Sequence, residues 1–373
     1  MSTRVRADNI GSLLRPAELL QARADYGAQR MDLKELRQVE DRAILKALAM
    51  QRATGIDVYT DGEYRRGMFT ADITQAVDGF VRSDRAATAS WRGPHRDIAV
   101  AARQGERQLV VGGRLQKKDR LLPDEAPFLK QHAPGPFKIC VPSLSYWSSR
   151  YRPGVTDSYY SSRGAMIADL AAILCDEVRA LVREGASYIQ LDAPSYTVHL
   201  MDPRGRQELV DAGLEPDEVL DDTISGDNQL IAEIQRSPDA TTGMHLCRGN
   251  NRSAWAAEGS YEPIAEKLFS ALQTDNFLLE FDTDRAGGFE PLRFVPKGKN
   301  VVLGLITSKE SQLESEDLLR RRVDEAAKYV PMENLAISTQ CGFASTAPGN
   351  LLSWDDQRRK LELVSRMARR IWG

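Results

Sequence analysis

The sequence predicts an α/β fold, specifically a (β/α)8 TIM barrel with a small β insertion near residues 78–116. Strand-like apolar runs alternate with helix-like amphipathic stretches along most of the chain, and counting gives about eight strands, mostly followed by helices. Polar residues that can do chemistry also follow directly after these strands, where barrels build their active sites. A doubly wound parallel sheet is the alternative, and the lack of a dinucleotide-binding glycine fingerprint disfavours it.

The first half of the chain gives the beginning of this pattern. We expect a strand over 5–10, a helix after Pro16, a long helix over 32–54 that Gly55 stops, and a short strand over 57–59. Residues 78–116 interrupt this alternation of strands and helices. Within them, the segments 98–102 and 108–111 have a β pattern.

The second half alternates more regularly. Strands are expected over 137–141, 188–191, the segment that leads to Cys247, 277–281, 300–303 and 335–338. Helices are expected over 166–185, 217–235, 263–273, 315–329 and 354–371.

Bulk properties narrow the class of protein. The 373 residues, with 42% hydrophobic and 28% charged side chains, are typical of a globular chain and fit a single barrel domain over 1–373. A net charge of −3 argues against a nucleic-acid surface, and the sequence has no apolar run near the roughly 20 residues that span a membrane. The N-terminus lacks the apolar core of a secretory signal, and four cysteines make no disulfide framework, so we expect a cytoplasmic protein.

The segment Thr242-Gly-Met-His245-Leu-Cys247 carries the clearest chemical signal. In a strand, residues i and i+2 face the same side, so an imidazole and a thiolate can reach one ion. Glu280 and Cys341 each end another predicted strand. Because zinc takes histidine, cysteine and carboxylate ligands in tetrahedral sites, the four residues predict a Zn²⁺ site. Cys140 and Cys175 are expected to be packing residues.

The spread of these ligands favours catalysis over structure. Structural zinc sites have closely spaced ligand pairs in small folds, whereas these four residues span about a quarter of a chain that can stabilise itself without metal. A thiol bound to zinc loses its proton near neutral pH and becomes a nucleophile. A site with every position taken by protein would instead be structural.

Other strand-end residues suggest substrate contacts. Glu63 and Asp192 could hold an ammonium group or transfer protons, and the plainer alternative is that they pair with Arg65, Arg66 or Arg248. Trp147 fits a stacking platform for a flat ligand and equally an aromatic side chain at the rim.

Several motifs together resemble the cobalamin-independent methionine synthase family, in consistent order from about residue 5 to 372, and most closely its short single-barrel members. The motifs are Ile10-Gly-Ser-Leu-Leu-Arg-Pro16, Thr60-Asp-Gly-Glu-Tyr-Arg-Arg66, Tyr188-Ile-Gln-Leu-Asp192, His245-Leu-Cys-Arg-Gly-Asn-Asn-Arg252, Leu279-Glu280 and Gln340-Cys-Gly-Phe343. The resemblance implies that zinc is bound by His245, Cys247, Glu280 and Cys341. It places homocysteine contacts on the backbone of Ile10, Gly11 and Ser12 and on Glu63 and Asp192, and a folate-stacking role on Trp147.

The chain also departs from the family pattern. Ala193 stands where an acidic residue often follows the strand-end aspartate, and Val198 where a glutamate contacts folate. Lys309 aligns with the proton-donating histidine, and Asn9 with a histidine of many short members. The sequence therefore supports thiol activation more firmly than it identifies the donor.

These features lead to three interpretations. The first is a zinc-dependent methyltransferase that alkylates homocysteine or a related thiol from folate or another carrier, with Lys309 as proton donor. The second is an enzyme similar to epoxyalkane:coenzyme M transferase, whose sulfonate would need an arginine such as Arg15, Arg65, Arg66 or Arg248. The third is a non-catalytic zinc-binding barrel. The expected partners are a small-molecule thiol and an alkyl donor, with no nucleic acid and no membrane, and a homo-oligomer is left open.

Overall fold

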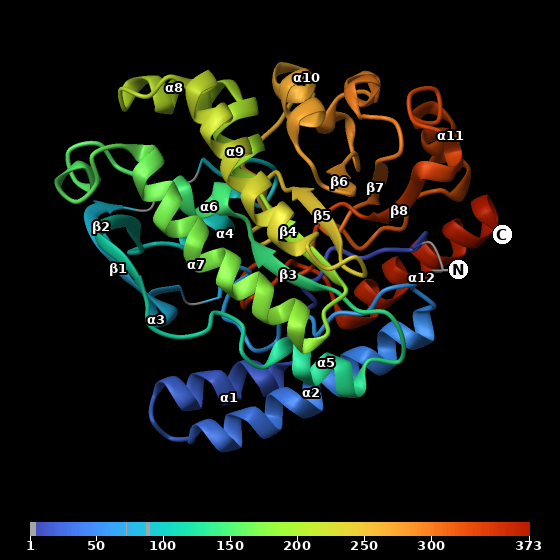
Figure 1. The fold of residues 1–373 in the computed structure, drawn as a ribbon. Helices are drawn as coiled ribbons and strands as arrows, with labels where there is room; N and C mark the ends of the chain where they lie inside the picture. Colours follow the sequence, from blue (N-terminus) through green and yellow to red (C-terminus); the bar gives the residue numbers. More distant parts are fainter. Residues whose placement is uncertain (1–4, 72, 87–89) are drawn as a thin grey trace.

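The computed structural model describes residues 5–71, 73–86 and 90–373 (Figure 1). A parallel sheet of six strands lies at its centre, and the strands follow one another in chain order. They are β3 (Ile139–Pro142), β4 (Tyr188–Asp192), β5 (Thr241–Leu246), β6 (Asn276–Glu280), β7 (Asn300–Ile306) and β8 (Leu335–Thr339). Most of their side chains are buried, as the nearly continuous apolar runs of these segments predict for parallel strands covered on both faces. The predicted α/β class is confirmed.

The long helices lie around the outside of these strands (Figure 1). They are α1 (Ala17–Gly27), α2 (Leu33–Thr54), α5 (Glu125–His132), α7 (Arg163–Glu184), α8 (Pro203–Asp211), α9 (Pro216–Ile234), α10 (Glu262–Ala271), α11 (Glu316–Ala326) and α12 (Trp354–Trp372), with a shorter α6 (Leu144–Ser148). The apolar side chains between sheet and helices form one large core cluster. No helix among the described residues combines the length and apolar character needed to cross a membrane.

Local sequence signals explain where the longest helices begin and end. The Asp32 side chain accepts the Glu35 N–H while Glu35 reaches back to the Asp32 N–H, which starts α2, and Gly55 ends it at a φ of +75°. Ser162 caps α7 and Gly185 ends it at a φ of +111°. The predictions of a helix over 32–54 and of its stop at Gly55 are confirmed.

The predicted strands over 5–10 and 57–59 are reduced to single bridges. Ala7 bridges Ile337 of β8, Tyr59 bridges Phe137 just before β3, and the Asp57 N–H donates to the Ala7 carbonyl at 2.9 Å. The Asp57 carboxylate accepts the N–H groups of Arg6 and Ala7, so a side chain replaces the regular strand ladder there. Both segments nevertheless lie beside the two outer strands of the sheet.

The β insertion is a separate antiparallel hairpin. It consists of β1 (Val77–Ala86) and β2 (Arg107–Lys117), preceded by the short helix α3 (Ile73–Ala76). The segment 108–111 belongs to β2 as predicted, but the β prediction for 98–102 is wrong, because α4 (Arg96–Ala101) is a helix. A short apolar run rich in alanine fits either structure by pattern, and alanine favours the helix.

The register of the sheet places functional residues at one level. Asp192 of β4 pairs with His245 of β5, which pairs with Leu278 of β6. Leu278 pairs in turn with Val302 of β7, and Val302 pairs with Ala336 of β8. These three residues pack with Ile10 in a small separate apolar cluster. Since side chains two residues apart share a face, Glu280 projects from the same face of β6 as Leu278, one step nearer the carboxyl end.

Candidate metal and substrate site

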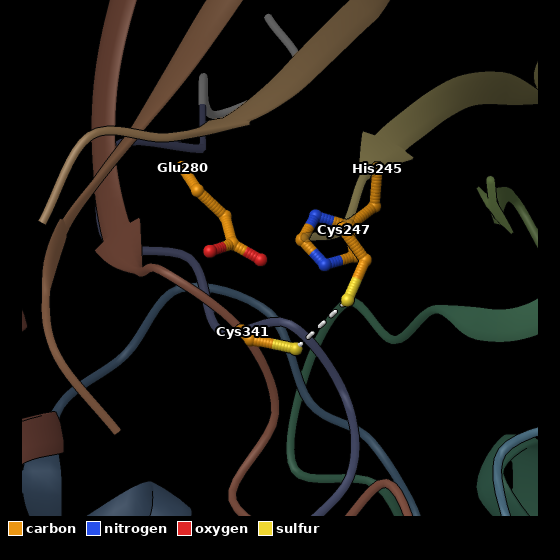
Figure 2. A group of neighbouring side chains, drawn as sticks. All are labelled: His245, Cys247, Glu280 and Cys341. Atoms are coloured by element: carbon orange, nitrogen blue, oxygen red, sulfur yellow. Dashed lines mark hydrogen bonds between the residues drawn. The ribbon is translucent and has the colours of Figure 1, made fainter. Parts of the chain in front are cut away.

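Four potential metal ligands converge at the carboxyl ends of the strands (Figure 2). His245 lies in β5, Cys247 directly after it, Glu280 at the end of β6 and Cys341 just after β8. One ligand atom from each lies within 4.8 Å of the others, and all four residues are buried. The two sulfur atoms are 3.5 Å apart. Two thiolates at the usual zinc–sulfur distance in a tetrahedral site would be about 3.8 Å apart, so the cluster already has nearly that spacing.

The histidine is oriented as a metal ligand. Its Nδ1 lies 3.3 Å from the Leu278 carbonyl oxygen, and its Nε2 is buried without a hydrogen-bond partner in the described part of the chain. A ligating histidine usually donates its other ring N–H to a carbonyl or carboxylate, which fixes the tautomer. The free Nε2, two thiols and a carboxylate therefore fit a zinc ion.

The two cysteines differ electrostatically. The hydrogen bond with Cys247 and the nearby charge of His245 lower the pKa of the Cys341 thiol against the effect of burial, whereas the hydrogen bond with Cys341, together with burial, raises the pKa of Cys247. Burial alone would lower the pKa of His245, but its interactions with Cys341 raise it to about 9. The cluster thus concentrates negative charge on Cys341 even without a cation, which favours a divalent metal.

Glu280 is held on both of its oxygens. Its Oε1 accepts the backbone N–H of Arg248 at 2.8 Å, and its Oε2 lies 3.1 Å from Nη2 of Arg285. The carboxylate is fully buried, and burial raises its pKa. It is the one member of the cluster that shares its ligand atoms with a guanidinium.

A second buried group lies beside the first. Glu63, Cys140 and Asp192 also bring potential ligand atoms within 4.8 Å of one another. Among the described residues, neither carboxylate forms an ion pair, and Oε2 of Glu63 has no hydrogen-bond partner. Cys140, expected to be a packing residue, is buried here and donates to the Ile10 carbonyl at 3.5 Å. A cationic substrate group fits this acidic pocket.

Burial dominates the titration of these carboxylates. It raises the pKa of Glu63 to about 8, against the opposing effect of Arg66, and that of Asp192 to about 6, against the opposing effect of His245. Two arginines that the sequence offered as ion-pair partners of these carboxylates pair elsewhere. Arg65 pairs with Glu40 and Asp41, and Arg66 pairs with Glu125. An incoming ammonium group would stabilise both ionised carboxylates.

The backbone of Ile10, Gly11 and Ser12 links the two groups. Gly11 has a φ of +118°, and a Cβ at this position would come within 2.4 Å of the Cys140 sulfur and 3.2 Å of Glu63. Ser12 accepts the Phe343 N–H on its carbonyl at 2.8 Å, which ties this segment to the loop of Cys341. Only glycine permits this backbone path so close to the carboxylate.

The two groups open into one cavity of about 1470 Å³. Ile10, Ser12, Glu63, Asp192, His245, Cys247, Cys341 and Trp147 all line it. Pockets for single drug-sized ligands have roughly 300–1,000 Å³, so this cavity has room for two reactants. The hairpin contributes Arg82 and residues 107–109 to the lining of the cavity.

Trp147 lines the cavity next to the hairpin. Its ring is 2% exposed and packs against Phe80 of the hairpin and Tyr146, at centroid distances of 5.7 and 4.9 Å. Arg150 lies over the Tyr146 ring, and burial together with Arg150 lowers the pKa of His199 to about 4. In this conformation the tryptophan is a packed wall residue, and the stacking role remains a prediction.

His199 and Val198 lie on a single turn of π-helix, Tyr196–Met201, that also lines the cavity. Such turns are rare and are frequently found at functional sites. Sequence patterns did not reveal this turn, because a single π-helical turn of six residues is too short to show a periodicity. Ala193, which follows Asp192, is fully buried.

Lys309 lies near the potential ligands Glu280 and Cys341 but is not among the residues that line the cavity. Its Nζ donates to Oδ1 of Asn250 at 2.8 Å and lies 3.5 and 3.4 Å from the carbonyls of Gly249 and Ala254. Burial lowers its pKa. The nearby Glu280 and Cys341 charges oppose that shift, so the ammonium lies within the electrostatic field of the ligands.

Two residues that sequence reasoning missed support the predicted ones. Gln190 is fully buried and donates to Oδ1 of Asp192 at 2.8 Å and to the Ile10 carbonyl at 2.9 Å. Its position two residues before Asp192 on one strand was the available signal. Asn250 donates to the Gly342 carbonyl at 2.7 Å and so connects the Cys247 loop to the Cys341 loop.

Comparison with known proteins agrees with this arrangement. The sequence profile described as "Cobalamin-independent synthase, Catalytic domain" matches residues 5–369. The chain belongs to the cobalamin-independent methionine synthase family. Membership in this family suggests methyl transfer to a thiol.

Relatives within the family cover nearly the whole chain. Two uncharacterized proteins of Bacillus subtilis, YxjH and YxjG, are each 34% identical, over 98% of this chain and 94% of their own length. The methionine synthase of Saccharolobus solfataricus is 24% identical over 90% of this chain and 86% of its own. A Listeria monocytogenes structure, provisionally assigned as a vitamin B12-independent methionine synthase, superposes with a TM-score of 0.73 at 28% identity and covers both chains completely.

Proposed function

We propose that this protein is a zinc-dependent transferase that moves a methyl group from a carrier to the sulfur of homocysteine or a related thiol. The observation that carries the proposal is the pairing of two buried groups in one cavity: four ligand atoms within 4.8 Å of one another, and the carboxylates of Glu63 and Asp192 beside them. One group suits a metal and the other suits an ammonium.

The two groups would orient an amino thiol. Asp192 and His245 are register partners on adjacent strands, so a short substrate can place its ammonium at Glu63 and Asp192 and its sulfur near His245, Cys247 and Cys341. The carbonyls of Ile10, Gly11 and Ser12 already accept hydrogen bonds, and the Gly11 N–H donates to Asn9. The N–H groups of Ile10 and Ser12 would therefore be the backbone donors for its remaining polar atoms. Holding both ends in this way fixes the direction in which the sulfur attacks.

A zinc ion held by His245, Cys247, Glu280 and Cys341 would lower the pKa of the substrate thiol and so supply a thiolate near neutral pH. The chain's own residues would then exclude water and hold the thiolate toward the donor. Lys309 is proposed as the source of the proton for the departing heteroatom, delivered through a water or a movement of the loop that it contacts. Its lowered pKa suits this role, because a weakly basic ammonium gives up its proton more readily.

The donor would occupy the wall formed by Trp147, the π-helical turn and the hairpin. The volume of the cavity accommodates a large carrier beside the thiol. Ala193 and Val198 provide no carboxylate there, so recognition of this donor would depend on packing and on the basic residues of the hairpin. The proposal also includes closure of the (β/α)8 barrel, which the bridges at Ala7 and Tyr59 support.

The epoxide-opening alternative has weaker support. A sulfonate needs a free arginine, and all four candidates have other partners. Arg15 donates to the carbonyls of Glu63, Arg66 and Ala344, and Arg248 to those of Gly259 and Ala286. Arg65 and Arg66 form ion pairs with acidic side chains. The acidic pair would also repel a sulfonate.

The direct test is product formation by the zinc-loaded protein. Homocysteine is incubated with methyltetrahydrofolate or methylcobalamin, and coenzyme M with epoxypropane, and products are identified by mass spectrometry. We expect methionine from one of the methyl donors. Formation of only the hydroxyalkyl thioether would replace the proposal with the epoxide reaction. No thiol alkylation by any pair would contradict it in favour of a binding protein.

A further inference from the structure

Arg285 occupies a position that the four-ligand cluster does not by itself explain. The chain leaves β6 at Glu280 and turns through Asp282 into a 3-10 turn, Asp284–Ala286, which directs Arg285 back to the metal cluster. Nη2 of Arg285 lies 3.1 Å from Oε2 of Glu280 and 2.7 Å from Oδ1 of Asp282. The guanidinium is 8% exposed and lies 5.0 Å from the ring centroid of Trp255.

The guanidinium has hydrogen-bonding capacity left over. One nitrogen, Nη2, serves both carboxylates, while Nη1 is buried and has no hydrogen-bond partner among the residues that the structure describes. Arginine binds carboxylates best through two parallel N–H···O bonds. A small movement of the Glu280 carboxylate toward Arg285 would therefore complete such a pair on a donor that is now unused.

Among the described residues, no guanidinium pairs with the other three ligands, and the Cys247 sulfur accepts only the weaker backbone N–H of Gly249 at 3.3 Å. His245 Nε2 has no hydrogen-bond partner in the described residues, and the Cys247 and Cys341 sulfurs lie next to each other. If a substrate thiol takes one position among the ligands, Glu280 is the ligand that can move away, because Arg285 offers it another partner. Its side chain is fully buried, so leaving its charge without a partner would be strongly unfavourable.

We propose that Arg285, steadied by Asp282, is the positioning residue that receives the Glu280 carboxylate and so determines how readily a thiol enters the metal cluster. Arg285 touches neither substrate nor the reacting atoms in this arrangement. It acts through Glu280 by stabilising the carboxylate away from the cluster. This inference rests on the proposed function, because it assumes a metal and a thiol at this site.

The test measures two affinities separately on the zinc-loaded protein. Zinc affinity is obtained by competition with a chromophoric chelator, and homocysteine affinity by calorimetry. The variants are Arg285→Met, which removes the donors, and Arg285→Lys, which keeps the charge but not the fork. Arg293→Met is the matched control, because Arg293 forms an exposed ion pair with Glu262 nearby in the chain.

We expect Arg285→Met to keep one zinc, with unchanged or tighter affinity, and to bind homocysteine at least about tenfold more weakly, since hydrogen bonds to buried charged groups are involved. Arg285→Lys should fall between wild type and Arg285→Met, and Arg293→Met should match wild type. Unchanged or tighter homocysteine binding in Arg285→Met would overturn the inference, and so would loss of its zinc, which would make Arg285 a support for the ligand. If Arg285→Met does not fold, Arg285→Lys is judged by the same two criteria. Failure of the wild-type protein to bind zinc or homocysteine would instead contradict the proposed function.

Discussion

The two ends of the cavity are built in different ways. The proposed acceptor end, with its four potential metal ligands and acidic pair, lies largely on the ends of parallel strands, where sheet register fixes Asp192 beside His245. The proposed donor end lies on connecting segments: the hairpin, the π-helical turn and the short helix α6 that carries Trp147. The comparison suggests that the shared chemistry lies on the rigid sheet, while the choice of donor is left to segments that can vary.

The two ends also differ in how exactly their side chains must be placed. At the acceptor end, atoms must meet within a few ångströms, and their buried charges allow few substitutions. At the donor end, Trp147 packs against Phe80 and Tyr146 in a way that other aromatic residues could reproduce. Substitutions at the acceptor end should therefore have the larger effects, and the following predictions test that ranking.

The largest effect is expected for Cys341→Ala. Losing one of four ligands should abolish stoichiometric zinc and lower turnover by about 10³-fold or more, because thiol activation depends on the metal. Metal content by atomic emission and initial rates measure both. Cys175→Ala is the matched control, since Cys175 lies near the Gln229 carbonyl on α9, outside the site, and should retain both properties.

Removing the proposed proton donor should have the next largest effect. Lys309→Met should lower kcat by about 10²-fold or more if Lys309 transfers a proton. Lys309→Arg keeps the charge and the contacts with the Asn250 loop but cannot give up a proton near neutral pH. Full activity in the arginine variant would show that Lys309 only supports the loop.

Substitutions in the acidic pair should weaken homocysteine binding more than they weaken zinc binding. Asp192→Asn is expected to weaken homocysteine binding by about 10- to 100-fold, because a buried charged contact to the ammonium is lost, while zinc content stays at one equivalent. Calorimetry with homocysteine and with 3-mercaptopropionate, which lacks the ammonium, measures this. Equal weakening for both thiols would mean that Asp192 does not bind the ammonium.

The pair also predicts a pH dependence. Burial raises the pKa of Glu63 to about 8 and of Asp192 to about 6, so the ligand-free pair retains protons that an ammonium would displace. Homocysteine affinity should thus rise several-fold between pH 6 and about 8. Protons should be released on binding, which calorimetry in buffers of different ionisation enthalpy detects. Proton uptake on binding would contradict this assignment.

The same pKa shifts predict a change in stability. Since raised carboxyl pKa values favour the protonated folded form, the free energy of unfolding of the ligand-free protein should fall between pH 6 and about 8.

The smallest effect is expected at the donor end. Trp147→Phe keeps an aromatic ring against Phe80 and should raise the KM for the donor by less than about tenfold, with homocysteine affinity unchanged. Steady-state kinetics with each substrate varied separately checks this. A loss as large as that of Asp192→Asn would remove the distinction between the two ends.

The sequence was most informative where function depends on strand ends. His245, Cys247, Glu280 and Cys341 could be predicted because periodicity placed each at the end of an apolar run, and the structure brings them together. The helix over 32–54 was predictable because Asp32, Glu35 and Gly55 are local signals. These features need only a few neighbouring residues to be recognised.

What sequence reasoning missed depends on contacts between distant segments. Cys140 was predicted to be a packing residue because its neighbours are apolar, but register with Gln190 turns it toward Glu63 and Asp192. Arg285 reaches Glu280 only through a tight turn that no periodicity reveals. The segment 98–102 was predicted as β because a short apolar run fits strand or helix equally well.

X-ray absorption at the zinc edge, with and without homocysteine, tests the central claim most directly. We expect one zinc per chain with two sulfur scatterers in the ligand-free protein. On addition of homocysteine we expect one more sulfur and one fewer oxygen scatterer. Absence of zinc, or coordination that does not change when homocysteine is added, would contradict the account.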